Sequence, residues 1–480
     1  MLPHIIPAPQ KLHAISPQPL VVFTTTLHEL AGQLSLWAPG AAARLTEAVG
    51  SLPALTTSPG QDLSGAAASQ TAHAVLDASL PPESFSLVAS AAQITLTASN
   101  TNGALYAVNA LIQALRTEGV VEFSATSAPQ YGWRGTMLDI SRHFFGVPEI
   151  KAVIDLASQY NLNQLHLHLS DDQGWRIEIE GRPELVKLAA DNDVDGGKGG
   201  HLSLVDYAEI QDYAELYGMT LVPEIDLPGH TNALQVAYPE LTPDGIPRKP
   251  YAGIEVGFSY VHLTSPKTWA VLEDIVASLA KHTRGEYLHM GGDEVLKVDR
   301  PDFEAFMGRL GKLVNKHGKK LTLWHEGAGA DLPPGTQLQY WTHDSNQENL
   351  SKAFDIPAVS FIASPAKHAY LDLKPVKDFP LGLTWAGLVN LETAFDWDPV
   401  QAIPVPGHLI SGVEACLWTE TIRSIDDITT MLLPRLPAVA SVAWGSTGSF
   451  ERFTDAIANH ARLWQDQEIV FYRDPAVTWH

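Results

Sequence analysis

The feature that most constrains the fold is a regular alternation of short apolar segments and amphipathic segments after residue 128. Strands that alternate with helices are typical of parallel β/α units, and eight such units predict a (β/α)8 TIM barrel over residues 129–480. A doubly wound sheet is the alternative, but the chain after the first strand lacks the Gly-rich phosphate turn of that fold. The eight expected strands are Arg134–Ile140, Gln164–Leu169, Thr220–Ile225, Tyr287–Gly291, Leu321–Trp324, Gln337–Trp341, Ser360–Ala363 and Gly412–Trp418.

Residues 1–128 have a different pattern and predict a small N-terminal α+β domain. Apolar and polar residues alternate over Phe85–Val88 and Ile94–Thr97, as expected for two short strands. From Ala104 to Arg116 the apolar residues recur at helical spacing. This region contains no cluster of candidate catalytic groups, so we expect the chemistry in the barrel.

Charge and composition exclude several classes of partner. The chain has 31 basic and 54 acidic side chains and a net charge of −23, which argues against nucleic acid and against an anionic membrane surface. No apolar run is long enough to span a bilayer, and a single Cys excludes an internal disulfide and a Cys-rich metal centre. The first residues, MLPHIIPAPQ, lack the features of a signal peptide, so we expect a cytoplasmic protein, although a secreted mature form would look the same.

Polar and aromatic side chains follow the predicted strands, at the point where each strand ends. In a TIM barrel the carboxyl ends of the strands surround the active site, so these side chains are expected to meet at one mouth. The candidates are Arg142, Asp171, Asp172, His230, Asp293, Glu294, Trp324, Glu326, Trp341, Tyr370, Asp372, Trp418 and Glu420.

The second predicted strand carries two rows of side chains. Leu165, Leu167 and Leu169 point one way and should pack under the outer helices, whereas His166 and His168 should face the barrel axis. Two His residues at this spacing could bind a metal. We favour a hydrogen-bonded polar core layer, because no third His or Cys ligand has clear spacing to complete a zinc site. The sequence therefore predicts no metal and no other cofactor.

Asp293 and Glu294 form the most informative pair. Gly291 and Gly292 precede them, which would let a ligand approach the backbone closely. An acidic cap at the start of a helix is the alternative explanation. The polar residues at the other strand ends favour a catalytic pair.

Four Trp residues fall at or near strand ends in the C-terminal half of the chain. Any one of them could simply pack in the core. Together they indicate an aromatic box for a sugar ring or an acetamido methyl group, although a cationic ligand would also suit them. They are Trp324, Trp341, Trp385 and Trp418.

These residues resemble those of family-twenty glycoside hydrolases, the β-N-acetylhexosaminidases. The resemblance extends from about Trp133 to Trp444, with the segments in family order. The most specific is the His-x-Gly-Gly-Asp-Glu motif at 289–294. The segments are RGTMLDISRHFF, NQLHLHLSDDQGWRIEIE, VPEIDLPGHT, LHMGGDEV, LWHE, QYW, YLD and GVEACLWTE.

The resemblance implies an exo-acting, retaining enzyme that removes terminal GlcNAc or GalNAc by substrate-assisted catalysis. Glu294 would be the general acid and then the base. Asp293 would orient the substrate's own 2-acetamido group, whose oxygen attacks the anomeric carbon to form an oxazolinium. This chemistry is an exception to the rule of two catalytic carboxylates. Tyr370 would hold the acetamido oxygen.

The resemblance also implies a set of binding residues. Trp324, Trp341 and Trp418 would wall the acetamido pocket, and Trp385 would offer a platform for the leaving sugar. Asp172 and His230 would form a supporting polar relay, with Asp171 as a further candidate. Three residues would hold hydroxyls of the ring: Arg142, Asp372 and Glu420. The partners would be oligosaccharides or glycoconjugates that end in an N-acetylhexosamine.

Three other functions remain open at this point. An ordinary retaining glycosidase would use a carboxylate nucleophile, for which Glu326 and Glu420 are the candidates. A catalytically silent glycan-binding barrel would have no need of an acid such as Glu294. A metal-dependent hydrolase would use His166, His168 and His230, and its activity would be lost in EDTA.

Overall fold

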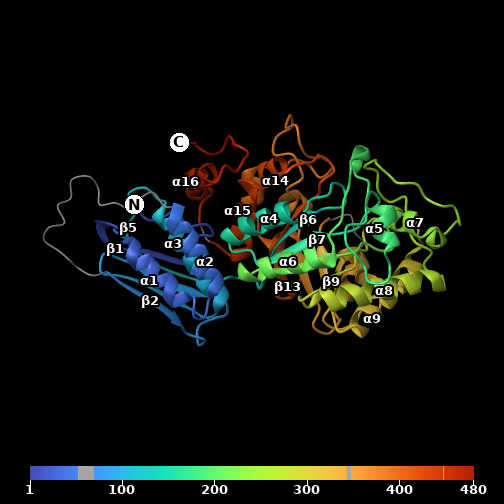
Figure 1. Ribbon diagram of the computed structural model, residues 1–480, viewed down its shortest axis with the longest axis horizontal. Helices are drawn as coiled ribbons and strands as arrows, with labels where there is room; N and C mark the ends of the chain where they lie inside the picture. The colour runs from blue at the N-terminus through green and yellow to red at the C-terminus, as the bar shows by residue number, and fades with distance from the viewer. Residues whose placement is uncertain (52–69, 343–346, 447, 480) are drawn as a thin grey trace.

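The computed structural model describes residues 1–51, 70–342, 347–446 and 448–479. Figure 1 shows two units, with the N-terminal unit in blue on the left and a larger unit on the right. The first is a five-stranded sheet of order β1-β5-β3-β4-β2. Helices α1, α2 and α3 pack together and against this sheet around their own apolar core. Its elements are β1 Lys11–Pro19, α1 Thr24–Leu34, α2 Pro39–Ser51, β2 Thr71–Leu76, β3 Phe85–Ala89, β4 Gln93–Ala98, α3 Thr101–Leu115 and β5 Val121–Ser127.

The second unit is a closed barrel of eight parallel strands, each paired with its neighbours in chain order. All eight strands expected from the sequence occur, with ends that differ by at most two residues. The predicted TIM barrel and the preceding α+β unit are therefore confirmed. The strands are β6 Trp133–Asp139, β7 Gln164–His168, β8 Thr220–Glu224, β9 Tyr287–His289, β10 Lys320–Trp324, β11 Gln337–Tyr340, β12 Ser360–Ala363 and β13 Ile410–Leu417.

Helices follow the strands and cover the outside of the barrel (Figure 1). The first, α4, begins with Val147 and Pro148 and carries Glu149 in its first turn, where the helix dipole favours an acidic group. None of the helices among the described residues is long and apolar enough to cross a membrane. They are α4 Val147–Gln159, α5 Glu184–Ala189, α6 Leu204–Leu216, α7 Asn232–Ala237, α8 Pro266–His282, α9 Arg300–Lys316, α10 Gln347–Ala353, α11 Ala366–Ala369, α12 Leu391–Phe395, α13 Pro399–Ala402, α14 Ile425–Leu432, α15 Arg435–Trp444 and α16 Phe450–Asp466.

The interior of the barrel contains a polar layer. Leu165, Leu167 and Leu169 are fully buried in the main apolar core, as the alternation along β7 predicts. The two His residues face the axis instead, where His166 Nδ1 lies 2.9 Å from Glu414 Oε1 and His166 Nε2 lies 3.0 Å from Glu224 Oε2. The predicted hydrogen-bonded core layer is therefore present.

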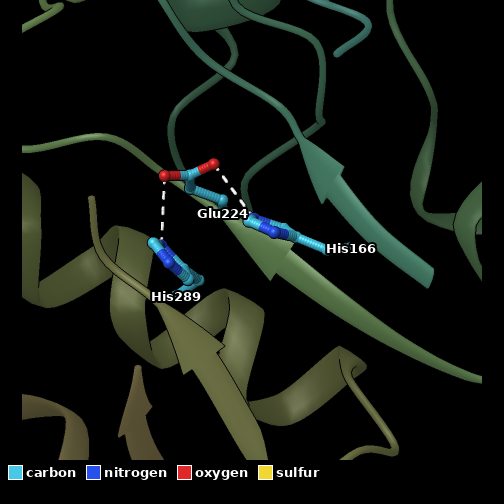
Figure 2. A group of neighbouring side chains, drawn as sticks. All are labelled: His166, Glu224 and His289. Carbon is cyan, nitrogen blue, oxygen red and sulfur yellow. Dashed lines mark hydrogen bonds and ion pairs between the residues drawn. The ribbon is translucent and has the colours of Figure 1, made fainter. Parts of the chain in front are cut away.

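The same layer places Glu224 between His166 and His289 (Figure 2), with their ligand atoms within 4.8 Å of one another. His166 lies between the carboxylates of Glu224 and Glu414, which accept hydrogen bonds. An imidazole in this position donates from both nitrogens and keeps no lone pair for a cation. Burial lowers the pKa of His166, but Glu224 and Glu414 outweigh it and raise the pKa to about 9.

The two units are joined by a buried arginine at the start of the barrel. Arg134 of β6 is fully buried. Its Nη1 donates to Glu83 Oε2 at 2.9 Å, and its Nη2 donates to the hydroxyl of Tyr106 at 2.8 Å. Both partners belong to the N-terminal unit, so a charged contact crosses the boundary.

Candidate active site

A cavity of about 310 Å³ lies at the mouth of the barrel, where the strands end. The structure brings most of the predicted site residues together in its lining. These are Arg142, Asp293, Glu294, Trp341, Tyr370, Asp372, Trp385, Trp418 and Glu420. Five predicted residues do not line it: Asp171, Asp172, His230, Trp324 and Glu326.

Asp293 and Glu294 follow β9 and share one imidazole. His230 Nε2 lies 3.9 Å from Asp293 Oδ2 and 3.4 Å from Glu294 Oε2. Burial raises the pKa of Asp293 to about 6, and the neighbouring carboxylates of Glu294 and Glu224 act in the same direction. His230 acts against this shift and lowers the pKa. Glu294 has a positive φ of 51°, an uncommon backbone conformation for a side chain other than Gly.

The two glycines before this pair fit against an acidic neighbour. Gly291 has a φ of 62°, and a Cβ at this position would overlap the carboxylate of Asp226. The amide of Gly292 donates to Asp226 Oδ1 at 3.1 Å. We expected the glycines to admit a ligand, but at Gly291 the space is taken by Asp226.

Aromatic rings enclose the cavity. Trp341 and Tyr370 stack with their centroids 6.2 Å apart and their planes at 14°. Trp385 meets both rings nearly edge-on and is 53% exposed, so it forms the outer rim. Trp418 lies 6.2 Å from Tyr370 and continues the wall.

Trp324 lies behind this wall. It is fully buried, its centroid is 5.9 Å from that of Trp418, and its Nε1 donates to Glu224 Oε1 at 2.8 Å. Trp324 does not line the cavity itself and contacts Trp418, which does, so its role as a wall of the pocket stays a prediction.

The resemblance to the hexosaminidases implies no role for Glu326. In the structure, Glu326 accepts hydrogen bonds from Trp341 of the aromatic wall. The indole Nε1 of Trp341 donates to Glu326 Oε1 at 2.9 Å and to Oε2 at 3.1 Å. Burial and the negative charges of Asp293 and Glu294 hold the pKa of Glu326 well above its ordinary value. Glu326 also lines a second cavity of about 520 Å³, on which Glu294, Trp341 and Trp385 border as well.

Charged residues also line the cavity, namely Arg142, Asp372 and Glu420 beside Asp293 and Glu294. The Arg142 guanidinium lies 4.8 Å above the Trp418 ring, and its Nη2 lies 2.8 Å from Asp171 Oδ2. Burial raises the pKa of Asp372 well above its ordinary value, and the Glu420 carboxylate adds to this effect. Arg142, Asp372 and Glu420 therefore offer one cation and two carboxyl groups to a ligand.

The partner of His230 is Asp171 rather than Asp172. His230 Nδ1 lies 3.2 Å from Asp171 Oδ1. Asp172 Oδ1 instead accepts from the Asn232 amide at 2.9 Å and from the Ser259 hydroxyl, which fixes two loops. Asp172 lies close to His230 as well, with ligand atoms of all three residues within 4.8 Å of one another, but the hydrogen bond to His230 is made by Asp171.

Three apolar residues of the lining were not predicted: Ile254, Val256 and Leu383. Ile254 and Val256 belong to the loop that follows α7, which has no strand or helix periodicity from which their position could be inferred. Ile254 is 48% exposed and Val256 is 38% exposed, so both belong to the rim.

The mouth of the barrel combines a pair of adjacent carboxylates, an aromatic wall and a set of charged side chains that can bind hydroxyls. This combination defines a glycoside hydrolase. The model of the glycosyl hydrolase family 20 catalytic domain matches residues 131–304 and 296–447, and the model of domain 2 of this family matches residues 2–128. The chain belongs to glycosyl hydrolase family 20.

Named relatives agree with this assignment. The chain is 41% identical to a β-N-acetylhexosaminidase of Cellulomonas fimi over 405 residues, which are 83% of this chain and 82% of the relative. The structure is similar to an N-acetyl-β-hexosaminidase of Streptomyces plicatus in complex with Thio-NAglucal, with a TM-score of 0.87, 35% identity and coverage of 99% and 98%. A family 20 β-N-acetylhexosaminidase of Streptomyces coelicolor A3(2) gives a TM-score of 0.87, 35% identity and 99% coverage of both chains. The predicted family, enzyme class and function are confirmed.

Proposed function

We propose that the protein removes terminal, non-reducing, β-linked N-acetylhexosamine residues from glycans, and that the residues at the barrel mouth act as follows. The main support is the position of the adjacent residues Asp293 and Glu294, which line an aromatic cavity. Their carboxylates lie 3.9 Å and 3.4 Å from His230 Nε2. A cavity of about 310 Å³ suits one sugar residue, since ligand pockets range over about 300–1,000 Å³.

Glu294 protonates the leaving oxygen and then activates water. It stands at the border between the two cavities, where a glycosidic oxygen would have a substituent on either side. General acid–base catalysis of this kind contributes about 10²–10⁴-fold in rate.

Asp293 orients the acetamido group and balances the positive charge that develops on its nitrogen. Tyr370 donates to the acetamido oxygen, which attacks the anomeric carbon in place of an enzyme group. A nucleophile that is already part of the bound substrate saves the entropy of bringing in a second molecule. Attack and hydrolysis each invert the centre, so the product retains its β configuration.

Arg142, Asp372 and Glu420 hold the hydroxyl groups at the far side of the ring, and Trp341 and Trp418 enclose the acetamido methyl. A sugar offers both hydroxyls and C–H groups, and the lining contains both charged and aromatic side chains that can contact them. Trp385, exposed at the rim, faces the next sugar. The substrates we propose are oligosaccharides and glycoconjugates that end in GlcNAc or GalNAc.

The test compares three 4-nitrophenyl glycosides: β-GlcNAc, β-GalNAc and β-glucoside. Only the first two carry an acetamido group, so we expect hydrolysis of one or both and at least a 10³-fold lower kcat/KM for the glucoside, in line with the effective molarity of a well-placed neighbouring group, about 10⁵ M or more. Comparable rates for the glucoside would show that an enzyme carboxylate, such as Glu326 or Glu420, is the nucleophile.

A further inference from the structure

His168 lies on β7 beneath the cavity, and the proposed reaction assigns it no role. It is fully buried. Its Nδ1 lies 2.6 Å from Glu224 Oε2, and its Nε2 lies 3.0 Å from Asp171 Oδ2. Ionised carboxylates only accept hydrogen bonds, so an imidazole between two of them has to donate from both nitrogens. The two carboxylates therefore favour His168 as an imidazolium ion.

The charges around His168 favour this state. Burial lowers its pKa, but the carboxylates of Glu224, Asp171 and Asp139 outweigh burial and hold the pKa well above the ordinary value. Arg142 Nη1 lies 3.3 Å from His168 Nε2 and could donate only to a nitrogen without a hydrogen. Asp171 Oδ2 is closer to Nε2, at 3.0 Å, and an ionised carboxylate accepts the hydrogen that Nε2 carries. A neutral ring without that hydrogen would set a lone pair against the carboxylate.

Asp171 connects His168 to both functional sides of the cavity. Its Oδ2, which accepts from His168, also accepts from Arg142 Nη2 at 2.8 Å. Its Oδ1 faces His230 Nδ1 at 3.2 Å, and His230 Nε2 faces Glu294 Oε2 at 3.4 Å. A rotation of the Asp171 carboxylate would therefore disturb both Arg142, which we propose binds the sugar, and His230, which lies next to the proposed acid Glu294.

His168 also contacts the aromatic wall. Its ring meets Trp418 edge to face, with centroids 4.9 Å apart and planes at 73°. The His168 imidazole thus contacts both Asp171, which is linked to Glu294 through His230, and Trp418, which lines the cavity.

We propose that His168 is a positioning residue for the reaction: by holding Asp171, it fixes His230 behind Glu294 and Arg142 beside the sugar. This inference rests on the proposed role of Glu294 as general acid. A residue that acts through the acid must affect substrates unequally. Leaving groups that depend on protonation should suffer most when it is lost, whereas general damage to the core would slow all substrates alike.

The first experiment uses His168→Gln, which removes the charge and one donor, with phenyl and 2,4-dinitrophenyl β-GlcNAc as substrates. We expect kcat for the phenyl glycoside to fall about 10–100-fold, as when an outer group that orients a catalytic residue is lost, and at least about 10-fold more than kcat for the dinitrophenyl glycoside. Thr322→Val is the matched control. Thr322 is a buried residue of β10 whose hydroxyl has no hydrogen-bond partner among the described residues, so both rates should stay within about two-fold. Equal losses for both leaving groups in His168→Gln would overturn the proposal.

A second measurement does not depend on whether the variant folds. In the unaltered protein with ¹⁵N-labelled histidine, the His168 ring should show two protonated nitrogens at neutral pH. A ring with one bare nitrogen would also overturn the proposal. Failure of the proposed function would look different, because the unaltered enzyme would then fail to cleave either acetamido glycoside.

Discussion

Asp293 is a buried carboxyl that has to be ionised when the acetamido nitrogen becomes positive. Its pKa is raised to about 6, chiefly by burial. Below that pH the folded protein holds Asp293 protonated, so kcat/KM should fall tenfold per pH unit on the acidic side, with an apparent pKa of about 6. A pH profile of kcat/KM on 4-nitrophenyl β-GlcNAc measures this. An acidic limb that begins near pH 4 would contradict it.

Removing the charge of Asp293 should also be costly at the optimum pH. Asp293→Asn keeps most of the shape but loses the electrostatic partner of the developing cation, which typically costs about 10²–10³-fold in kcat. Substrate binding should persist, so KM changes much less than kcat. Steady-state kinetics on the variant check the division, and a pure KM effect would speak against this role.

Glu294→Gln should reveal the acid through the leaving group. We expect a loss of about 10²–10⁴-fold for a phenyl glycoside and a much smaller one for a 2,4-dinitrophenyl glycoside, which departs without protonation. The ratio of the two rates in the variant and in the unaltered enzyme is the measurement. An identical loss for both substrates would remove Glu294 from the role of acid.

At the scale of elements, the turn after β10 supports a side chain that follows β11. Glu326 accepts from the Trp341 indole, and a glutamine amide oxygen could accept the same hydrogen bond. Glu326→Gln should therefore keep kcat/KM within a few-fold, whereas Glu326→Leu leaves the indole without an acceptor and should lower kcat/KM about 5–10-fold, as expected for one lost buried hydrogen bond. Both values come from kinetics on 4-nitrophenyl β-GlcNAc. Loss of activity in Glu326→Gln would instead identify a carboxylate nucleophile.

The strands and helices are the part of the structure that the sequence predicts best. Short apolar strands between amphipathic helices have few alternative arrangements, and alternation along β7 places Leu165 outside and His166 inside with no further information. The site was predicted less fully. The choice of Asp171 over Asp172 depends on which side chain turns toward His230, and Ile254 reaches the rim through a loop without periodicity. Such contacts are set by tertiary packing.

For the whole molecule, the link between the two units should contribute to stability. Glu83 neutralises Arg134, which is fully buried, and Glu83→Gln would leave that charge without its carboxylate. Breaking a buried ion pair typically costs about 3–5 kcal/mol, so the free energy of unfolding should fall by about 3 kcal/mol in urea titrations while the activity of the folded protein is preserved.

Asp331→Asn is the control for this prediction. It breaks the exposed pair with Lys312, whose side chains are 84% and 65% exposed, and should leave the urea midpoint unchanged. If Glu83→Gln behaves like this control, the interface contact does not stabilise the fold.

The central claim is that the substrate's own acetamido oxygen is the nucleophile, with Asp293 and Glu294 supplying orientation, charge and protons. Successive fluorination of the acetamido methyl weakens that oxygen without changing the leaving group or the ring. The most direct measurement is kcat/KM for 4-nitrophenyl glycosides that carry acetyl, monofluoroacetyl, difluoroacetyl and trifluoroacetyl groups on the 2-nitrogen. We predict a steep, continuous fall across the series, because the nucleophile is lost by degrees. A flat series would contradict the account and would show that a group of the enzyme attacks the sugar.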